Sequence, residues 1–383
     1  MNLITDNDEL RAFCAPLATV DYVTVDTEFI RERTYWPVLC LLQIGGPDGA
    51  AAVDALAPGI DLAPVFELLA NRNVLKVFHA ARQDMEIFCR AMDDCPAPVF
   101  DTQIAAMVCG FGDSVGYETL VAKLAKATVD KSSRFTDWAA RPLSDKQISY
   151  ALSDVTHLRT VYEKLQAKLE KSGRLAWVAS EMEALHNRSF YETDPMEAYE
   201  RLKVRRPSPR LLAILREVAA WREIEAQRAD VPRNRIVRDE SIVEIAHHPP
   251  KSIENLARIR GLSQKMAEGW QGRQIMEAVE RGRALPDDEC PTPVEKLVLP
   301  RGIGPVADLL KVFLKMCAEE SGVAQRLIAN SEDIDTIAAF GEDADVPALK
   351  GWRRELFGEA ALKLRDGRMG LAIKDRVLTV VDL

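Results

Sequence analysis

The hydrophobic pattern of the chain changes abruptly near residue 206, and this change constrains the fold more than any other feature. Before it, short apolar runs typical of strands alternate with helical patterns. The strand patterns cover residues 20–26, 38–44, 51–54, 74–78 and 99–101, and the helical patterns cover residues 62–71, 82–92 and 144–169. After RRPSPR at 205–210, the patterns are helical, at residues 211–229, 241–247, 251–259 and 263–280. The sequence therefore predicts an α/β domain followed by all-α units.

A chain of 383 residues is long enough for two or three domains with separate cores. The stretch CPTP at 290–293 marks a second joint, and another helical pattern continues from there to about residue 364. We therefore expect an α/β domain at residues 1–200, a helical domain at 207–286 and a second helical domain at 291–383.

The composition is that of a soluble globular protein, with 47% hydrophobic and 28% charged residues. No apolar run approaches the roughly eighteen residues of a membrane span, and MNLITDNDEL has neither the basic nor the apolar region of a secretion signal. We expect a cytoplasmic protein without a membrane partner. The seven cysteines form no C-x-x-C pair, so free buried thiols are expected rather than a zinc site or a disulfide framework.

Charge is distributed unevenly along the chain. Residues 1–199 carry 19 Lys and Arg against 29 Asp and Glu, whereas residues 200–285 carry 18 against 12. An acidic first half joined to a basic middle is typical of an enzyme whose acidic site takes cations while another segment contacts phosphate.

The stretch YVTVDTEF places two carboxylates in an apolar strand. Side chains two residues apart on a strand point to the same face, so Asp26 and Glu28 lie side by side and repel each other unless a cation separates them. Alone, such a pair is usually the solvated end of a strand.

Three further candidates lie elsewhere in the α/β half. In KVFHAARQDMEIF, a buried strand leads into a helix with Asp84 near its start, where the helix dipole favours an anion. In SYALSDVTHL, Tyr150 and Asp154 are four residues apart on a helical face. By itself, the first motif is usually a helix cap, and the second often occurs by chance.

Together, the four carboxylates predict a cluster that divalent cations must neutralise, because acids in one cleft raise each other's pKa and oppose folding. Phosphoryl transfer with two metal ions about 3.5–4 Å apart uses such a cluster, one ion activating water and the other stabilising the leaving oxygen. A group such as Tyr150 can orient the attacking water.

Four stretches in order, VDTEFIRERTYWPVLCLLQIG, KVFHAARQDMEIF, DTQIAA and FTDWAARPLSDKQISYALSDVTHL, resemble the exonuclease domain of the ribonuclease D family. This family belongs to the DEDD exonucleases of the subtype with tyrosine in the third motif. The resemblance covers about residues 1–180. It implies a ribonuclease H-like fold, with a mixed five-stranded sheet flanked by helices.

The resemblance also implies a role for each acid. Asp26 would bridge two ions, Mg²⁺ or Mn²⁺, Glu28 and Asp154 would hold the ion on the nucleophile side, and Asp84 would support the other. Tyr150 would orient the water.

The basic middle segment, from SPRLLAILREV to ARIRGLS, resembles the HRDC domain, a small helical module. Its arginines Arg233, Arg235 and Arg238 are candidates for phosphate contacts that position RNA without reading sequence, although a solvated bundle without a ligand would carry the same charges. The segment with LKGWRRELFGEAALKL is similar to the C-terminal region of the same family and is expected to be a second, diverged HRDC-like bundle.

The expected function is that of a metal-dependent 3′→5′ exoribonuclease, a monomer that releases 5′-monophosphates from RNA, with tRNA precursors that have accessible 3′ ends as substrates. Direction, product and tRNA preference come from the resemblance alone. Two alternatives remain open: a DNA exonuclease of the same superfamily, because the acids do not distinguish the sugars, and a non-catalytic nucleic-acid-binding module.

Overall fold

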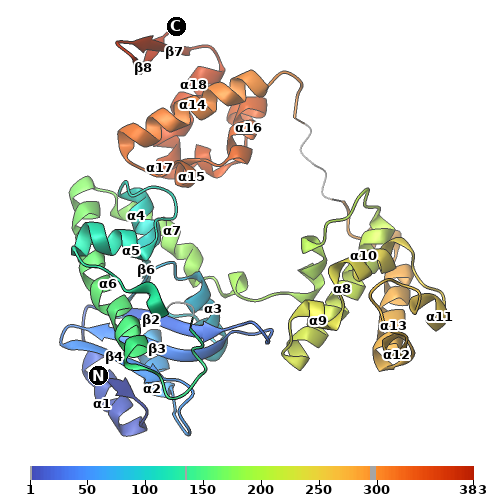
Figure 1. Ribbon diagram of the computed structural model, residues 1–383. Helices are drawn as coiled ribbons and strands as arrows, with labels where there is room; N and C mark the ends of the chain where they lie inside the picture. The colour runs from blue at the N-terminus through green and yellow to red at the C-terminus, as the bar shows by residue number, and fades with distance from the viewer. Residues whose placement is uncertain (1, 134–135, 294–298) are drawn as a thin grey trace. The chain divides into compact units, whose positions relative to one another are not determined.

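The computed structural model describes residues 2–133, 136–293 and 299–383. The chain forms two compact units (Figure 1). The first consists of Met1–Glu28, Cys40–Arg188 and Leu297–Leu383, and the second consists of Phe29–Leu39 and Ser189–Lys296. One residue of the quoted motifs, Phe135, and its neighbour Arg134 lie outside the described residues. The predicted boundaries of the three domains stay a prediction.

The first unit contains a mixed sheet with the strand order β1-β4-β3-β2-β5-β6. Its strands are β1 Leu3–Ile4, β2 Tyr22–Ile30, β3 Val38–Gly46, β4 Gly49–Asp54, β5 Leu75–Phe78 and β6 Val99–Asp101. The β3–β4 pair is antiparallel, whereas β2–β5, β5–β6 and β1–β4 are parallel. The predicted fold class is confirmed, but the sheet has six strands instead of five. The two-residue strand β1, too short to give an alternating pattern, pairs with β4.

Seven α-helices accompany this sheet in the described part of the α/β region. They are α1 Asn7–Leu17, α2 Ala63–Ala70, α3 Arg82–Ala91, α4 Thr102–Val108, α5 Tyr117–Leu120, α6 Asp145–Ser172 and α7 Leu175–Glu183. The longest, α6, packs against β4 and β5 and lies along the sheet in Figure 1. Helices α2, α3 and α6 match the predicted segments within a few residues.

Helix α6 has clear start and stop signals. Ser144 forms a capping box with Gln147, and Gly173, with φ 68°, ends the helix in the left-handed conformation that glycine adopts without steric cost. Its buried face repeats at helical spacing and contributes to the core with Ile148, Ala151, Val155, Leu158, Val161, Leu165 and Leu169. The core therefore fixes which face of α6 points toward the sheet.

The C-terminal residues of the first unit form a helical bundle of their own. Its α-helices are α14 Gly304–Ser321, α15 Gln325–Ile328, α16 Ser331–Phe340, α17 Gly351–Arg353 and α18 Glu359–Arg365. Trp352 stacks on Trp177 of α7 at 4.6 Å between ring centroids, and Arg353 pairs with Glu181 at 2.6 Å. These contacts join the bundle to the α/β region within one unit.

The expectation that the C-terminal domain is purely helical is wrong in one respect. An antiparallel hairpin of β7 Met369–Lys374 and β8 Val377–Asp382 follows α18. The β-branched residues of RVLTVVDL favour a strand. This run is short and follows a long helical pattern, so the periodicity before it predicts a helical domain up to the end of the sequence.

The second unit is a helical bundle that also holds residues 29–39. Its α-helices are α8 Pro209–Ala229, α9 Arg233–Ile236, α10 Asp239–His247, α11 Ile253–Leu256, α12 Gln264–Glu268 and α13 Trp270–Ala284, preceded by the 3₁₀ helix η5 Pro195–Arg201. Apolar residues of α8, α10 and α13 form its core. The predicted helix over 263–280 is divided by Gly269, which is extended with ψ −171°.

The segment 29–39 is joined to the helical bundle through Asp230. One carboxylate oxygen of Asp230 accepts hydrogen bonds from the backbone amides of Tyr35 and Trp36, at 3.1 and 3.0 Å. The segment 29–39 therefore belongs to the second unit, whereas the strand residues up to Glu28 belong to the first.

Two further findings concern the predicted chemistry of the chain. The expectation of free cysteines is wrong for one pair, since Cys89 and Cys95 form a disulfide, while the other five cysteines are free and buried. The spacing between these two cysteines gave no signal, because helix α3 ends between them. In the described residues, no helix combines the length and apolarity that crossing a bilayer requires.

Candidate active site

Strand β2 presents the first two acids. It continues to Ile30, beyond the strand pattern predicted for residues 20–26, so both Asp26 and Glu28 lie within the strand. Both are partly buried, and with the buried Asp154 of α6 they place three carboxylate oxygens within 4.8 Å of one another. The structure thus brings together acids from two elements that are more than a hundred residues apart in sequence.

Helix α6 brings Tyr150 to the same place, one turn before Asp154. Burial raises the pKa of the Tyr150 phenol, and the charges of Asp154 and Glu28 raise it further. The phenol therefore stays protonated at neutral pH and can donate a hydrogen bond. The Trp138 ring lies beside it, with 6.1 Å between ring centroids.

The fourth acid, Asp84, stands in the first turn of α3 and is buried. The hydroxyl of Thr27, on β2 between the two strand acids, donates a hydrogen bond to the Asp84 carboxylate. Burial raises the pKa of Asp84 well above its usual value, and the charge of Asp26 raises it further. Asp84 is not one of the three clustered carboxylates, but it lies near enough to Asp26 for their charges to repel.

The turn that leads into α3 is held by the acid of the DTQIAA stretch. Asp101 accepts hydrogen bonds from the backbone amides of Ala80 and Ala81, both at 2.9 Å. Ala80 has φ 59°, a left-handed conformation that costs a residue with a side chain about 1–2 kcal/mol. Asp101 therefore stabilises the strained turn that positions Asp84.

The stretch before α6 is held by Arg141. Its guanidinium makes two hydrogen bonds to Asp54 at the end of β4, at 2.6 and 2.7 Å, and a third to the carbonyl of Trp138 at 2.7 Å. A bidentate pair of this kind fixes direction as well as distance. Arg141 thereby ties the start of α6, and the two site residues on it, to the sheet.

The cluster is self-repelling as it stands. Burial raises the pKa of Asp26 well above the usual value, and the charge of Asp154 adds to this. Carboxylate oxygens are the ligands that Mg²⁺ and Mn²⁺ prefer, and a bound cation reverses the sign of the local potential. The donor set therefore fits a divalent metal ion.

Sequence reasoning missed Tyr117 of α5. Its hydroxyl donates hydrogen bonds to the backbone carbonyls of Asp154 and Ser153, at 2.6 and 3.2 Å, and Thr24 of β2 donates to the carbonyl of Val155 at 2.8 Å. These hydrogen bonds fix the α6 backbone at Asp154 and at the residues on either side of it. No spacing signal could have identified them, because they join side chains to main-chain atoms of a distant element.

The three arginines predicted to contact RNA lie in the second unit and play different local roles. Arg233 of α9 makes two hydrogen bonds to the buried Glu223, at 2.5 and 2.7 Å. Arg235 is exposed on the same helix, and Arg238 is exposed and precedes α10. Their contact with RNA stays a prediction.

Comparison with known proteins extends the resemblance to the whole chain. A family model for a 3′–5′ exonuclease matches residues 1–170, and a model for the HRDC domain matches residues 212–279. Ribonuclease D of Granulibacter bethesdensis is 50% identical over 380 residues, 99% of this chain and 96% of that protein. Ribonuclease D of Acidiphilium cryptum is 51% identical over 385 residues, covering 100% and 97%.

A solved structure agrees with these sequence relatives. The crystal structure of Escherichia coli RNase D superimposes with a TM-score of 0.81 at 29% identity, covering 96% of this chain and 99% of that one, and is described as an exoribonuclease involved in structured RNA processing. The acidic cluster matches the divalent-metal dependence of the DEDD exonucleases. The chain belongs to the ribonuclease D family of 3′→5′ exoribonucleases.

Proposed function

We propose that Asp26, Glu28, Asp84 and Asp154 hold two divalent ions, Mg²⁺ or Mn²⁺, and that the chain removes nucleotides singly from the 3′ end of RNA, releasing 5′-monophosphates. The observation that carries this proposal is the convergence of three carboxylates within 4.8 Å, with Asp84 close to Asp26. Divalent ions in such a site activate water and stabilise the charge on the leaving oxygen. The phosphate and the acids would otherwise repel each other.

The role of Tyr150 is to hold and orient the attacking water. A phenol with its ordinary pKa of about 10 is mostly protonated near neutral pH, so Tyr150 is a poor general base but a good hydrogen-bond donor. Its position one helical turn from Asp154 lets its hydroxyl reach the space beside the carboxylates.

The substrates we propose are RNAs with accessible 3′ ends, such as tRNA precursors, acted on by a monomer in the cytoplasm. The E. coli relative is described as acting in structured RNA processing. The basic balance of residues 200–285 supports a role of the second unit in holding the RNA backbone.

The test uses 5′-end-labelled RNA and DNA of identical sequence, each with and without chelator. We expect stepwise shortening of RNA that stops when chelator is added. Equal shortening of DNA would mean that the sugar is not read, since RNA selectivity requires a contact to the 2′-hydroxyl. Absence of metal-dependent cleavage of either strand would overturn the proposal.

A further inference from the structure

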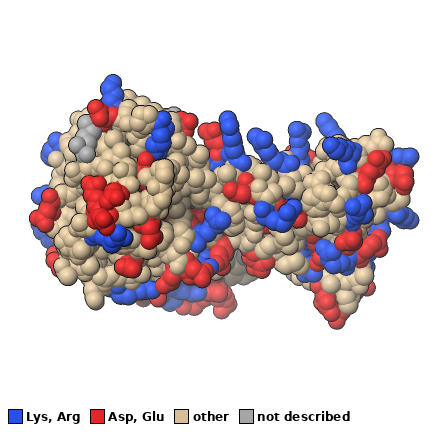
Figure 2. All heavy atoms as spheres, turned by 90° about the horizontal axis from the view of Figure 1, so that it is seen from below, with Lys and Arg blue, Asp and Glu red and all other residues tan. Residues whose placement is uncertain are grey.

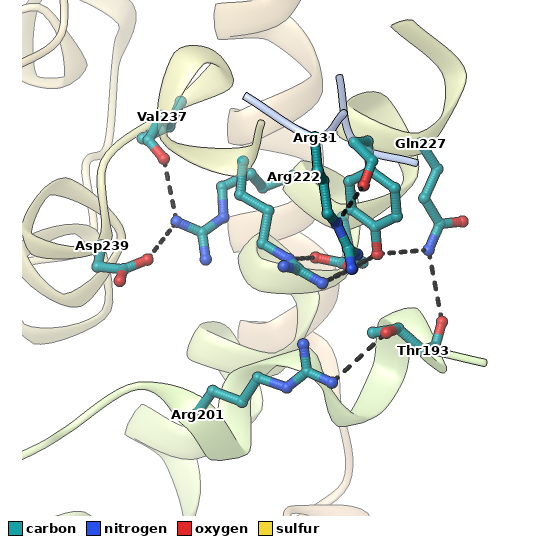
Figure 3. Close-up of polar contacts among 10 residues, drawn as sticks. Arg31, Thr193, Arg201, Arg222, Gln227, Val237 and Asp239 are labelled. Carbon is teal, nitrogen blue, oxygen red and sulfur yellow. Dashed lines mark hydrogen bonds and ion pairs between the residues drawn. The ribbon is translucent and has the colours of Figure 1, made fainter. Parts of the chain in front are cut away.

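The buried acid Asp84 has a different kind of partner from the buried charges of the second unit. In that unit, the buried Arg222 pairs with Asp239, as Figure 3 shows. At the surface, Lys and Arg side chains lie among Asp and Glu side chains on the face shown in Figure 2. Asp84 forms no ion pair with the residues that the structure describes, and the side chain that hydrogen-bonds to its carboxylate is Thr27. The direction of this buried carboxylate therefore depends on a neutral donor.

Thr27 lies on the face of β2 opposite to the two strand acids. The hydroxyl of Thr24 donates to the carbonyl of Val155, so the even-numbered residues of the strand face α6. Asp26 and Glu28 share that face, whereas Thr27 projects from the other one. There its hydroxyl reaches Asp84 in the first turn of α3. The two faces of one strand thus each hold a part of the acidic site.

The backbones on both sides of this hydrogen bond are fixed by other contacts. Strand β2 lies inside the sheet, between β3 and β5. The turn before α3 is held by Asp101, which accepts hydrogen bonds from the amides of Ala80 and Ala81. The freedom that remains to Asp84 is rotation of its own side chain, and the terminal torsion of an aspartate is broad. Thr27, whose branched side chain is stiff, limits this rotation through its hydroxyl.

Asp84 also stands apart from the other three acids of the site. It is not one of the three carboxylates whose oxygens lie within 4.8 Å of one another. Asp84 and Thr27 are each only 7% exposed, so little solvent reaches the carboxylate to replace the hydroxyl as a donor. A group that hydrogen-bonds to a metal ligand typically contributes 10–100-fold to metal affinity or activity, because it sets the direction of that ligand before the ion binds.

We propose that Thr27 is a positioning residue, whose hydroxyl holds the Asp84 carboxylate in place as a ligand for a divalent ion. The proposal rests on the proposed function, because it takes Asp84 as a metal ligand. A threonine with a structural role alone would satisfy its buried hydroxyl in this way, and loss of the hydroxyl would cost stability without changing metal binding. The two roles therefore differ in what they predict for the metal ion.

Calorimetric titration of the metal-free full chain with Mn²⁺ compares Thr27→Val with Thr27→Ser. Valine keeps the branched shape and loses the hydroxyl, whereas serine keeps the hydroxyl and loses a methyl group. We expect Thr27→Val to weaken Mn²⁺ binding by about 10–100-fold and Thr27→Ser to retain most of the wild-type affinity. Wild-type affinity in Thr27→Val, or equal losses in both variants, would overturn the proposal. Should valine prevent folding, Thr27→Ala gives the same comparison with Thr27→Ser.

A double-mutant cycle with Asp84→Ala identifies the residue through which Thr27 acts. Once the Asp84 carboxylate is absent, Thr27→Val should cause no further loss of Mn²⁺ affinity. An equal loss in both backgrounds would place the effect elsewhere and overturn the proposal.

The matched control is Thr102→Val, at a fully buried threonine whose hydroxyl donates to the carbonyl of Phe78 at 3.0 Å. It should lower the free energy of unfolding in urea and leave Mn²⁺ affinity unchanged. A loss of affinity equal to that of Thr27→Val would mean that any buried hydroxyl of this domain has the same effect, and would overturn the proposal.

Kinetics on end-labelled RNA with Mg²⁺ separate positioning of a ligand from contact with the substrate. Thr27→Val should lower kcat by about 10–100-fold and leave KM for RNA unchanged. A raised KM with unchanged kcat would mean that the hydroxyl contacts RNA, and would overturn the proposal. Failure of the proposed function is recognised separately in the wild type. A chain that cuts no RNA, but whose Mn²⁺ affinity depends on Thr27 and Asp84, would lose the exonuclease assignment and keep the role of Thr27.

Discussion

The carboxylate cluster of the first unit and the arginine pocket of the second unit both gather like charges, but these charges are compensated differently. The arginine pocket is lined by Arg31, Arg201, Arg222 and Arg233. In the cluster, burial and mutual repulsion raise the pKa of Asp26 and Asp84. In the pocket, the chain supplies its own counter-charge: burial alone would raise the pKa of Glu223, but hydrogen bonds from Arg233 and Tyr35 outweigh this and lower it. The cluster therefore depends on an external cation for neutrality, whereas Glu223 and Arg233 compensate each other within the chain.

This difference makes the two regions respond oppositely to the removal of one charge. Neutralising an acid of the cluster relieves repulsion, costs catalysis and leaves the fold intact. Neutralising Glu223 leaves the partly buried Arg233 without its carboxylate partner and lowers the stability of the fold. The predictions below test this contrast, in order of decreasing effect.

The largest effect is expected from neutralising one acid of the cluster. Asp26→Asn or Asp154→Asn should abolish RNA cleavage, because the donor set for divalent ions is broken. Without metal, either variant should be as stable as the wild type or slightly more stable. Asp145→Asn, an exposed acid in the first turn of α6, is the control and should retain full activity. Retention of wild-type activity by Asp154→Asn would remove this residue from the site.

Tyr150→Phe should have the next largest effect. Loss of the hydroxyl should reduce the turnover rate by roughly 10²–10⁴-fold, the range for a positioned acid–base group. RNA affinity and metal affinity, measured by anisotropy and calorimetry, should change little. Tyr162→Phe on the same helix is the control and should leave turnover unchanged. Loss of metal binding in Tyr150→Phe would instead mean that the phenol supports the ligand shell.

Glu223→Gln should lower the free energy of unfolding by about 3 kcal/mol, because it leaves Arg233 and the Tyr35 hydroxyl without the carboxylate that they share. Urea denaturation of the full chain measures this effect. Glu240→Gln, at an exposed position, should change stability by less than about 0.5 kcal/mol. Higher stability of Glu223→Gln would mean that the desolvation cost of the Glu223–Arg233 ion pair exceeds the favourable energy of their interaction.

The smallest effect is a difference in pH dependence. The raised pKa of Asp26 means that the folded, metal-free chain binds protons more tightly than the unfolded chain, so stability falls as pH rises from about 3.8 through the folded pKa. The lowered pKa of Glu223 has the opposite sign: its contribution is present above about 4.5 and is lost as pH falls through the folded pKa.

Denaturation in chelator over a pH series separates the two contributions. The advantage of Asp26→Asn over the wild type should grow with pH, and the advantage of the wild type over Glu223→Gln should shrink below pH 4.5, each by at most about 1.4 kcal/mol per pH unit for one proton. Added Mg²⁺ should raise the melting temperature of the wild type by mass action. A melting temperature insensitive to millimolar Mg²⁺ would contradict the cation requirement of the cluster.

The carboxylate cluster was predictable because each of its residues belongs to a periodic element. Two-residue spacing placed Asp26 and Glu28 on one face of a strand, and four-residue spacing placed Tyr150 and Asp154 on one face of a helix. Only their convergence required the fold, and the family resemblance supplied that.

The pocket was not predictable for the opposite reason. Arg31, Arg201 and Arg222 come from a strand connection, a 3₁₀ helix and an α-helix, and no local period links them. Arg222 looks like an ordinary polar residue in an amphipathic helix until tertiary packing buries it. Three other features were missed because no local periodic pattern marks them. They are the two-residue strand β1, the disulfide between Cys89 and Cys95, and the hydrogen bonds from Tyr117 to the α6 backbone.

The uninterrupted length of α6 has a consequence for how the enzyme loses activity. No glycine or proline interrupts its 28 residues, and its buried face extends from Ile148 near the capped end to Leu169 near the other end. Tyr150 and Asp154 therefore cannot be released by fraying of a flexible loop. Amide hydrogen exchange at Val155 and Leu158 should proceed only when the whole α/β core opens. The site is then as stable as the α/β domain that contains it, and inactivation by heat should coincide with the unfolding of that domain.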